Sequence, residues 1–168
     1  MNSELMFGGD RFWIFQSNVK NDYGFDIRSS CRIQDRIEAW PIKQYYKEIH
    51  KGDYCFIWAC GLGNKKSGIY SIGEVISDVF PAKSNTFPQY RYGFRYPSNG
   101  FEVLVKYIHP ITNYISRDVF PKNPTLSQCS IMRYHQATVF PVTEEEKESL
   151  LRVGSVTEEE LSKKPAKQ

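Results

Sequence analysis

The feature that most constrains this chain is a nearly continuous apolar run at residues 54–60, Tyr-Cys-Phe-Ile-Trp-Ala-Cys. Aromatic and β-branched residues favour a strand, whose successive side chains point to opposite faces. Because no polar residues alternate with the apolar ones, both faces of this strand must be covered. The run is also far shorter than the roughly 20 apolar residues of a membrane span, and no other run approaches that length. We therefore expect a buried strand in a protein that has no membrane partner.

Four other segments have the composition of strands. They are residues 11–17, 69–80, 101–109 and 137–142. Gly73, inside the second of these segments, predicts a bulge or bend. Because the helical segments are short and irregular, we expect an α+β fold, a small barrel of five or six strands with short helices at its rim. A mixed sheet with helices on one side is the alternative.

Short helices are expected at several places along the chain. Pro41 suits the first turn of a helix over residues 41–50, whose apolar stripe would be Ile42, Tyr45, Tyr46 and Ile49. Residues 116–120 and 124–129 are typical of single helical turns. Two threonines that each precede three glutamates predict capping boxes, Thr143 and Thr157.

The charge of the chain is mild, +3 at neutral pH, and it is unevenly spread. Residues 143–168 hold seven Glu against five Lys or Arg, whereas the preceding part holds 17 Lys or Arg against 12 Asp or Glu. A body with a net charge of +5 can approach a polyanion, but this charge is too weak to act alone. Any nucleic-acid binding should therefore depend on a shaped site.

Catalytic and metal-binding patterns are absent from the sequence. The four cysteines form no Cys-x-x-Cys, and no His stands at a ligand spacing from any of them. Free thiols are typical of a reducing cytosol, so we expect a cytoplasmic protein. The sequence also lacks a Walker loop, a Gly-x-Ser-x-Gly and a His-Glu-x-x-His. We therefore expect a binding module that has no cofactor and no metal.

The aromatic residues, 15% of the chain, indicate a binding site. Trp13, Trp40 and Trp58 lie near polar groups or a glycine turn, and a planar heterocycle needs both stacking and hydrogen bonds at its edge. We expect the three indoles to form a cage around a base, with Trp58 as one wall. Three tryptophans buried in the core are the alternative. The edge of the base would be read by Ser17, Asn18 and the backbone near Ala59 and Cys60.

A second signal is the segment Tyr-Arg-Tyr-Gly-Phe-Arg-Tyr at residues 90–96. In an extended chain its aromatic side chains share one face, and Arg91 and Arg95 share the other. We expect these arginines to contact phosphates, which position a protein on DNA without reading its sequence. A hairpin that covers the core is the alternative. Further backbone contacts are expected from Lys20, Lys65, Lys66, Arg133 and His135.

In their order and spacing, these residues resemble the EVE domain, a member of the PUA-like superfamily that is related to the YTH domain. The resemblance is carried by Trp13-Ile-Phe-Gln-Ser17, Trp40, Lys51-Gly-Asp53, residues 68–75 and the closing segment 131–143. It covers residues 11–153, which leaves an N-terminal tail at 1–10 and a C-terminal linker or tail at 154–168. It implies a PUA-like pseudo-barrel that holds a flipped, modified base in an aromatic pocket.

We therefore expect a reader module that recognises a methylated base, in DNA, by flipping it into the pocket. Such modules also occur in modification-dependent restriction enzymes, whose catalytic part would be a separate domain or subunit. Two alternatives stay open: a PUA-like module that reads a modified RNA base, and an RNA-cleaving enzyme similar to ASCH proteins. The sequence departs from the family pattern near the expected pocket, where Asn18 replaces a Glu and Trp58-Ala59 replaces Tyr-His. The identity of the base therefore does not carry over.

Overall fold

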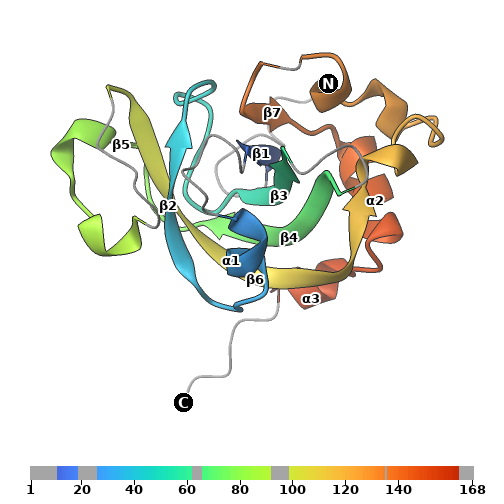
Figure 1. Ribbon diagram of the computed structural model, residues 1–168, viewed down its shortest axis with the longest axis horizontal. Coiled ribbons are helices and arrows are strands. Elements are labelled where there is room, and N and C mark those ends of the chain that lie inside the picture. The colour runs from blue at the N-terminus through green and yellow to red at the C-terminus, as the bar shows by residue number, and fades with distance from the viewer. Residues whose placement is uncertain (1–10, 19–25, 62–65, 92–98, 135, 163–168) are drawn as a thin grey trace.

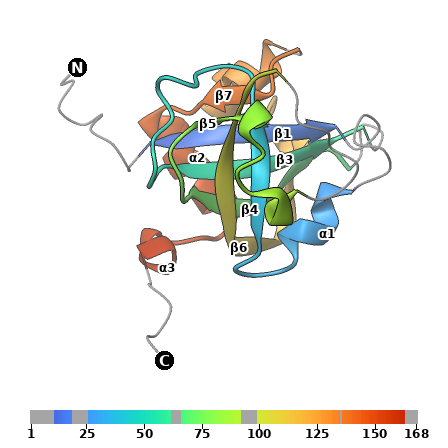
Figure 2. The same cartoon turned by 90° about the vertical axis from the view of Figure 1, so that its left-hand side faces the viewer.

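The computed structural model describes residues 11–18, 26–61, 66–91, 99–134 and 136–162. These residues form one curled sheet with short helices around it (Figures 1 and 2). The strands are β1 Phe12–Asn18, β2 Ile37–Ile42, β3 Tyr54–Cys60, β4 Gly68–Val75, β5 Phe80–Pro81, β6 Phe101–Ser116 and β7 Val139–Pro141. The α-helices are α1 Ile27–Cys31, α2 Glu144–Val153 and α3 Glu158–Ser162. The 3₁₀ turns are η2 Ala82–Ser84, η3 Pro88–Tyr90, η4 Arg117–Val119, η5 Leu126–Gln128 and η6 Ser130–Met132. The α+β pseudo-barrel expected from the sequence is confirmed.

The order of strands in the sheet is β2-β6-β4-β3-β1-β7, and β5 pairs with β6 outside this path. β1 and β3 are parallel neighbours, whereas every other described pair is antiparallel. A parallel pair needs a crossover connection. Here that connection contains α1 and β2, and β2 lies at the far edge of the sheet before the chain returns to β3.

The central strands β1 and β3 are buried on both faces, as the apolar run at residues 54–60 predicts. Alternate side chains enter two separate cores. The α1-side core includes Trp13, Phe15, Ile27, Trp40, Ile57, Val105 and Tyr107. The α2-side core includes Phe12, Ile14, Phe56, Trp58, Ile115, Phe120 and Leu150. Figure 2 shows α1 on one side of the sheet and α2 and α3 on the other.

The long strand β6 contributes to both cores, and its pairing with β4 is irregular. The register between the two strands shifts twice, between Ile69 and Ser71 and between Ile72 and Gly73. A Cβ atom at Gly73 would lie 2.5 Å from Cγ1 of Val105, so only glycine fits there. The bend expected at this glycine is therefore confirmed. β4 itself ends at Val75 and β6 continues to Ser116, unlike the ranges expected for these strands.

The helix expected over residues 41–50 is wrong. Pro41 lies in β2, an edge strand, where a residue without an N–H group is tolerated. Tyr45 has a φ of 59°, which no α-helix accommodates. Ile42 and Ile49 are buried, but Tyr45 and Tyr46 are 41% and 40% exposed, so the expected stripe does not face a single core.

The C-terminal segment packs on the domain as far as residue 162. The Thr157 capping box is complete: the Thr157 hydroxyl accepts from the Glu160 N–H, and the Glu160 carboxylate accepts from the Thr157 N–H. Thr143 caps α2 through its hydroxyl, which accepts from the Glu146 N–H, but the Glu146 carboxylate does not bond back to the Thr143 N–H. Val156 is buried in the α2-side core, and Leu161 packs against it. The segment from Val156 to Leu161 therefore contacts the α2-side core.

Gln44 connects the two edges of the open sheet. It lies two residues after β2, and its side-chain carbonyl oxygen accepts from the N–H groups of Thr138 and Val139 at 3.0 and 3.2 Å. The Thr138 hydroxyl donates to the same oxygen at 3.3 Å. Since β2 and β7 are the outermost strands of the sheet order, this single oxygen links the loop after one outer strand to the start of the other.

We expect Gln44→Ala to lower the free energy of unfolding by about 1–3 kcal/mol, because two partly buried backbone N–H groups lose their acceptor. Urea unfolding followed by tryptophan fluorescence measures this change. The matched control is Gln34→Ala, which removes an exposed amide and should stay within about 0.5 kcal/mol of the native protein. Equal stability of the two variants would contradict the role assigned to Gln44.

Candidate nucleic-acid interface

Four of the predicted base contacts lie together at the carboxyl ends of β1 and β3. In the parallel register Ser17 pairs with Ala59 and Asn18 pairs with Cys60. Ser17 and Ala59 are buried, whereas Asn18 and Cys60 are half-buried. Gly61, with a φ of 86°, turns the chain immediately after β3. We call these four residues the strand-end edge; their contact with a base stays a prediction.

The three predicted cage tryptophans are all buried. Trp13 is 0% exposed, and its indole N–H donates to the carboxylate of Asp53 at 2.9 Å. Trp40 is 2% exposed and donates to the Tyr107 hydroxyl at 3.0 Å. Both indoles belong to the α1-side core, and both of their N–H groups already have acceptors.

Trp58 belongs to the opposite core. It is 2% exposed and packs against Phe120 with ring centroids 5.3 Å apart and rings nearly perpendicular. Because side chains alternate along a strand, Trp58 and Ala59 face opposite sides of the sheet. The expected cage of three indoles is therefore wrong: two of them lie on one side of the sheet and one on the other. The alternative, tryptophans buried in the core, describes this structure.

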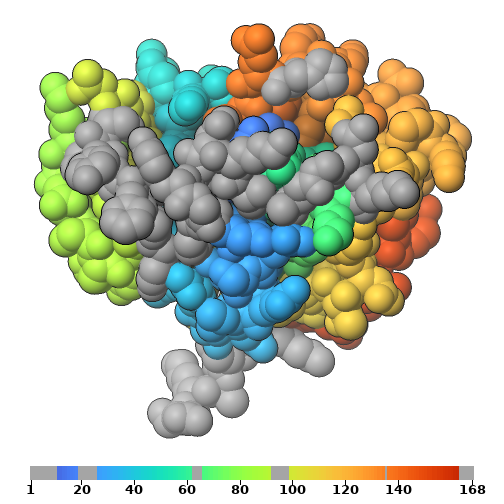
Figure 3. Space-filling view, viewed as in Figure 1, coloured from blue at the N-terminus to red at the C-terminus, as the bar shows by residue number. Residues whose placement is uncertain are grey.

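A cleft that the sequence did not predict lies beside the strand-end edge. Its volume is about 600 Å³, and we call it the α1 cleft. It is lined by Arg28, Cys31, Arg32, Lys66, Tyr70, Pro110, Ile111, Thr112 and Tyr114. Figure 3 shows α1 and the residues after it, the start of β4 and the later part of β6 side by side on one face of the molecule.

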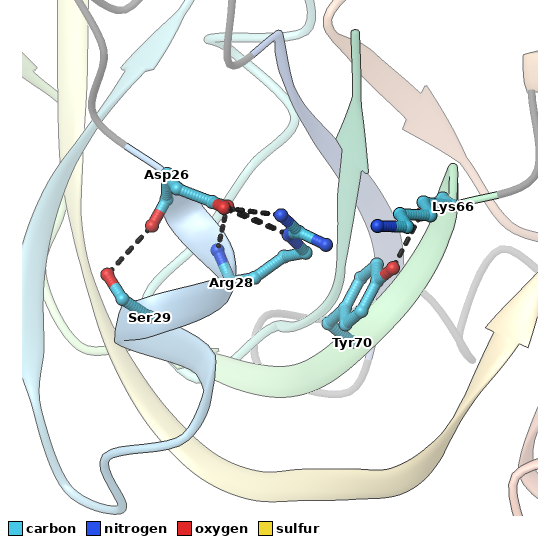
Figure 4. Close-up of polar contacts among 5 residues, drawn as sticks. All are labelled: Asp26, Arg28, Ser29, Lys66 and Tyr70. Carbon is cyan, nitrogen blue, oxygen red and sulfur yellow. Dashed lines mark hydrogen bonds and ion pairs between the residues drawn. The ribbon is translucent and has the colours of Figure 1, made fainter. Parts of the chain in front are cut away.

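Asp26 caps α1 and holds Arg28, one of the cationic residues that line the cleft. Its carboxylate accepts from the Arg28 backbone N–H at 2.9 Å and from Nε and Nη2 of the Arg28 guanidinium at 3.0 and 2.6 Å (Figure 4). These hydrogen bonds lower the pKa of Asp26 and raise the pKa of Arg28. The pair is therefore charged at neutral pH, and it holds the guanidinium 5.9 Å from the ring centre of Tyr70.

Two stacked tyrosines form an aromatic wall of the cleft. The rings of Tyr70 and Tyr114 are parallel, with centroids 4.6 Å apart and an interplanar angle of 1°. The Tyr70 hydroxyl donates to the Lys66 carbonyl at 2.5 Å, and partial burial raises the pKa of this hydroxyl. Burial also raises the pKa of the Cys31 thiol, so this group is not an activated nucleophile.

The α1 cleft and the strand-end edge meet at the start of β4. Gly68 pairs with Ala59 on one side and with Ser116 on the other. A Cβ atom at Gly68 would lie 2.1 Å from the Ile115 carbonyl oxygen, so β4 and β6 approach closely there. Lys66, two residues earlier, therefore stands between the end of β3 and the cleft. Of the cleft residues, only Lys66 was expected as a contact, since cations and tyrosines far apart in sequence carry no common pattern.

The other predicted phosphate contacts that the structure describes, Arg91 and Arg133, do not line the α1 cleft. The Arg91 side chain is 7% exposed; its guanidinium donates to the Ala82 carbonyl at 2.8 Å and forms an ion pair with Glu102. A buried arginine with these partners does not face a phosphate, so this expectation is wrong. Arg133 is exposed and donates to the Gln128 carbonyl. Lys20, Lys65, Arg95 and His135 lie outside the described residues.

The described residues contain neither a cluster of metal ligands nor a membrane-spanning helix. No group of three or more His, Cys, Asp or Glu side chains in this part of the chain could hold a metal ion. No helix within the same residues is long and apolar enough to span a membrane. The four cysteines are free thiols, as expected. The candidate binding features among the described residues are therefore the strand-end edge and the α1 cleft.

Comparison with protein families identifies the chain. The sequence pattern of the EVE domain matches residues 11–153. The chain belongs to the EVE domain family. No protein of curated function is significantly similar to it in sequence.

Several solved structures share the fold of this EVE domain. Human THYN1 protein, in complex with DNA that contains 5-methylcytosine, is 13% identical, with a TM-score of 0.65 over 93% of this chain and 100% of that chain. Rpa0253 from Rhodopseudomonas palustris is 18% identical, with a TM-score of 0.62 over 94% and 99% of the two chains. An ASCH protein from Zymomonas mobilis is 10% identical, with a TM-score of 0.51 over 88% and 99%. At these identities the similarity concerns the fold.

We expect Trp58→Ala to lower the free energy of unfolding by about 3–5 kcal/mol, because it leaves a cavity beside Phe120 in a packed core. Thermal unfolding followed by circular dichroism measures the loss. Trp58→Phe keeps an aromatic ring and should cost clearly less. If Trp58→Ala is as stable as the native protein but loses DNA binding, Trp58 is a pocket wall after all.

A second stability prediction concerns the buried ion pair. Arg91→Ala should lower the free energy of unfolding by about 3–5 kcal/mol, since it leaves the Glu102 carboxylate buried without its guanidinium. Replacing both residues by Met should recover part of this loss. For the folded fraction of Arg91→Ala, we expect the salt dependence of DNA binding to stay unchanged. A flatter salt dependence would instead assign Arg91 to a phosphate contact.

Proposed function

We propose that this EVE domain reads a methylated base in DNA and does not cleave the strand. The base is flipped out of the duplex, and its hydrogen-bonding edge meets the strand-end edge. The observation that carries this proposal is the register of β1 and β3, which sets Ser17 and Asn18 opposite Ala59 and Cys60 beside a cationic cleft. The DNA-bound structure of human THYN1, which has the same fold, supports DNA as the partner.

The strand-end edge has the chemistry that base reading needs. Parallel strands that end together expose successive backbone groups at one edge, and Ser17 and Asn18 add a hydroxyl and an amide. A methyl group on the base packs against apolar atoms of the pocket that holds it, and its absence leaves a void. Apolar discrimination of this kind is worth about 1–3 kcal/mol.

Flipping a base costs a few kcal/mol, so the domain must also hold the backbone. The α1 cleft contributes three cationic side chains against the single carboxylate of Asp26, which gives it a net charge of +2. Backbone contacts of this kind increase affinity for every sequence and leave the choice of base to the edge. A module of this kind serves as the front part of a larger modification-dependent enzyme, which would supply any cleavage.

A binding panel tests this function. It consists of duplexes that carry cytosine, 5-methylcytosine, 5-hydroxymethylcytosine, adenine or N6-methyladenine at one position, together with RNA that carries the same bases. We expect one methylated DNA base to bind at least tenfold more tightly than its unmodified parent, in line with the discrimination above. The substrates should remain intact after incubation with divalent metal ions. Preference for RNA, or cleavage, would overturn the proposal.

The site itself is tested by Asn18→Ala. This variant should bind DNA that carries the methylated base about fivefold more weakly, because the flipped base loses one hydrogen bond worth about 1 kcal/mol. Its affinity for unmodified DNA, which is held through backbone contacts, should change little, so the preference falls by the same factor. Fluorescence anisotropy at fixed salt measures both affinities. Gln34→Ala, an exposed amide in the hollow next to Tyr54 at the opposite end of β3, is the matched control. If both variants keep the full preference, the strand-end edge does not read the base.

A further inference from the structure

We propose that the α1 cleft is a separate nucleotide subsite, which binds the phosphodiester-linked nucleotide next to the base that is read. This inference rests on the proposed function and deepens it, because it assigns a second, flanking position of the strand to a defined part of the surface. Its ligand has two chemical parts, an anionic phosphate and a base with two flat aromatic faces. The cleft has a matching surface for each part.

The cationic part of the cleft is available to a phosphate. Within the described residues, Arg32 and Lys66 form no ion pair, and both are exposed. Arg28 is held differently: Asp26 takes the Nε and Nη2 side of its guanidinium, which fixes the side chain between the carboxylate and Tyr70 (Figure 4). Arg28 therefore supplies an ordered charge, and the other two cations supply donors that can reach a ligand.

The other part of the cleft is aromatic and apolar. Tyr70 and Tyr114 stack on each other, so their rings are fixed as a wall, and Pro110 and Ile111 extend this apolar lining. Aromatic side chains of this kind stack on unpaired bases with little dependence on sequence. The volume of about 600 Å³ lies within the range of about 300–1,000 Å³ that is typical of small-molecule pockets. A nucleotide therefore fits the cleft in size and in chemistry.

Because the cleft adjoins the strand-end edge, its ligand is a nucleotide of the DNA strand that carries the base that is read. Gly68 pairs with Ala59 of β3, which belongs to the strand-end edge, and with Ser116 of β6. Lys66, two residues before Gly68, lines the cleft. The helix α1 closes the other side of the cleft, since its residues Ile27 and Cys31 are buried in the α1-side core. A strand whose base is held at the edge therefore enters the cleft with its neighbouring phosphate.

Short single-stranded DNA separates the subsite from the base site. The ligands are a mononucleotide that carries the preferred methylated base, a trinucleotide with that base in the centre, and the same trinucleotide without the modification. We expect the native protein to bind the modified trinucleotide about tenfold more tightly than the mononucleotide. We call this tenfold gain in affinity the increment. The double variant Arg32→Ala/Lys66→Ala should lose the increment but should still prefer the trinucleotide with the methylated central base. Lys47→Ala/Lys51→Ala, which removes two exposed cations near the opposite end of β3, should keep both.

Tyr114→Ala distinguishes the aromatic part from the cationic part. It should reduce the increment for trinucleotides with intact flanking bases, but not for trinucleotides whose flanking positions are abasic. Circular dichroism establishes that each variant is folded before binding is measured.

The outcomes separate this inference from the proposed function. If the native protein shows no preference for the methylated trinucleotide over the unmodified one, the proposed function fails, whatever the cleft does. If that preference is present and Arg32→Ala/Lys66→Ala keeps the full increment, the subsite is overturned and the function stands. A third outcome is that an equal concentration of free unmodified mononucleotide abolishes the tenfold gain in affinity of the trinucleotide. The cleft is then a site for free nucleotides, and its assignment to a nucleotide of the same strand is overturned.

Discussion

The parallel pairing of β1 with β3 is the constraint on which the rest of this structure depends. Both strands are apolar on both faces, so each face needs its own cover, and the core divides into an α1-side part and an α2-side part. Parallel strands also need a long crossover, which here contains α1 and β2. The same pairing ends both strands at one edge. Core burial and the position of the candidate site therefore have one physical origin.

Asp53 shows how buried polar groups support this arrangement. Its carboxylate accepts from the Trp13 indole, from the His50 backbone N–H at 2.9 Å and from the Arg11 backbone N–H at 3.3 Å. A buried carboxylate is tolerated only when such partners compensate for its lost hydration. Asp53 thereby ties the beginning of β1 to the turn before β3. The motif Lys51-Gly-Asp53, which carried part of the family resemblance, is a structural element of the fold.

The sequence predicted the family correctly, but it predicted the site residues less well. The order of the EVE segments identified the fold, although solved structures with the same fold are only 10–18% identical to this chain. At such identity the similarity shows the fold and does not assign individual site residues. Trp58 illustrates the risk: a large aromatic residue beside a glycine turn looked like a pocket wall, but the alternation of β3 places it in the core against Phe120. The same alternation sets Ala59 on the other face.

The sequence by itself determined the elements whose signals are local. These are the strands at 12–18 and 54–60, the bend at Gly73, and the helix caps at Thr143 and Thr157. They follow from apolar content, from a missing side chain and from hydrogen bonds between near neighbours. Only the tertiary structure decided what long-range pairing controls. It converted the expected helix at 41–50 into an edge strand and a loop, buried Arg91 against Glu102, and assembled the α1 cleft from three segments. Contacts between residues tens of positions apart depend on strand order and register, which no local pattern encodes.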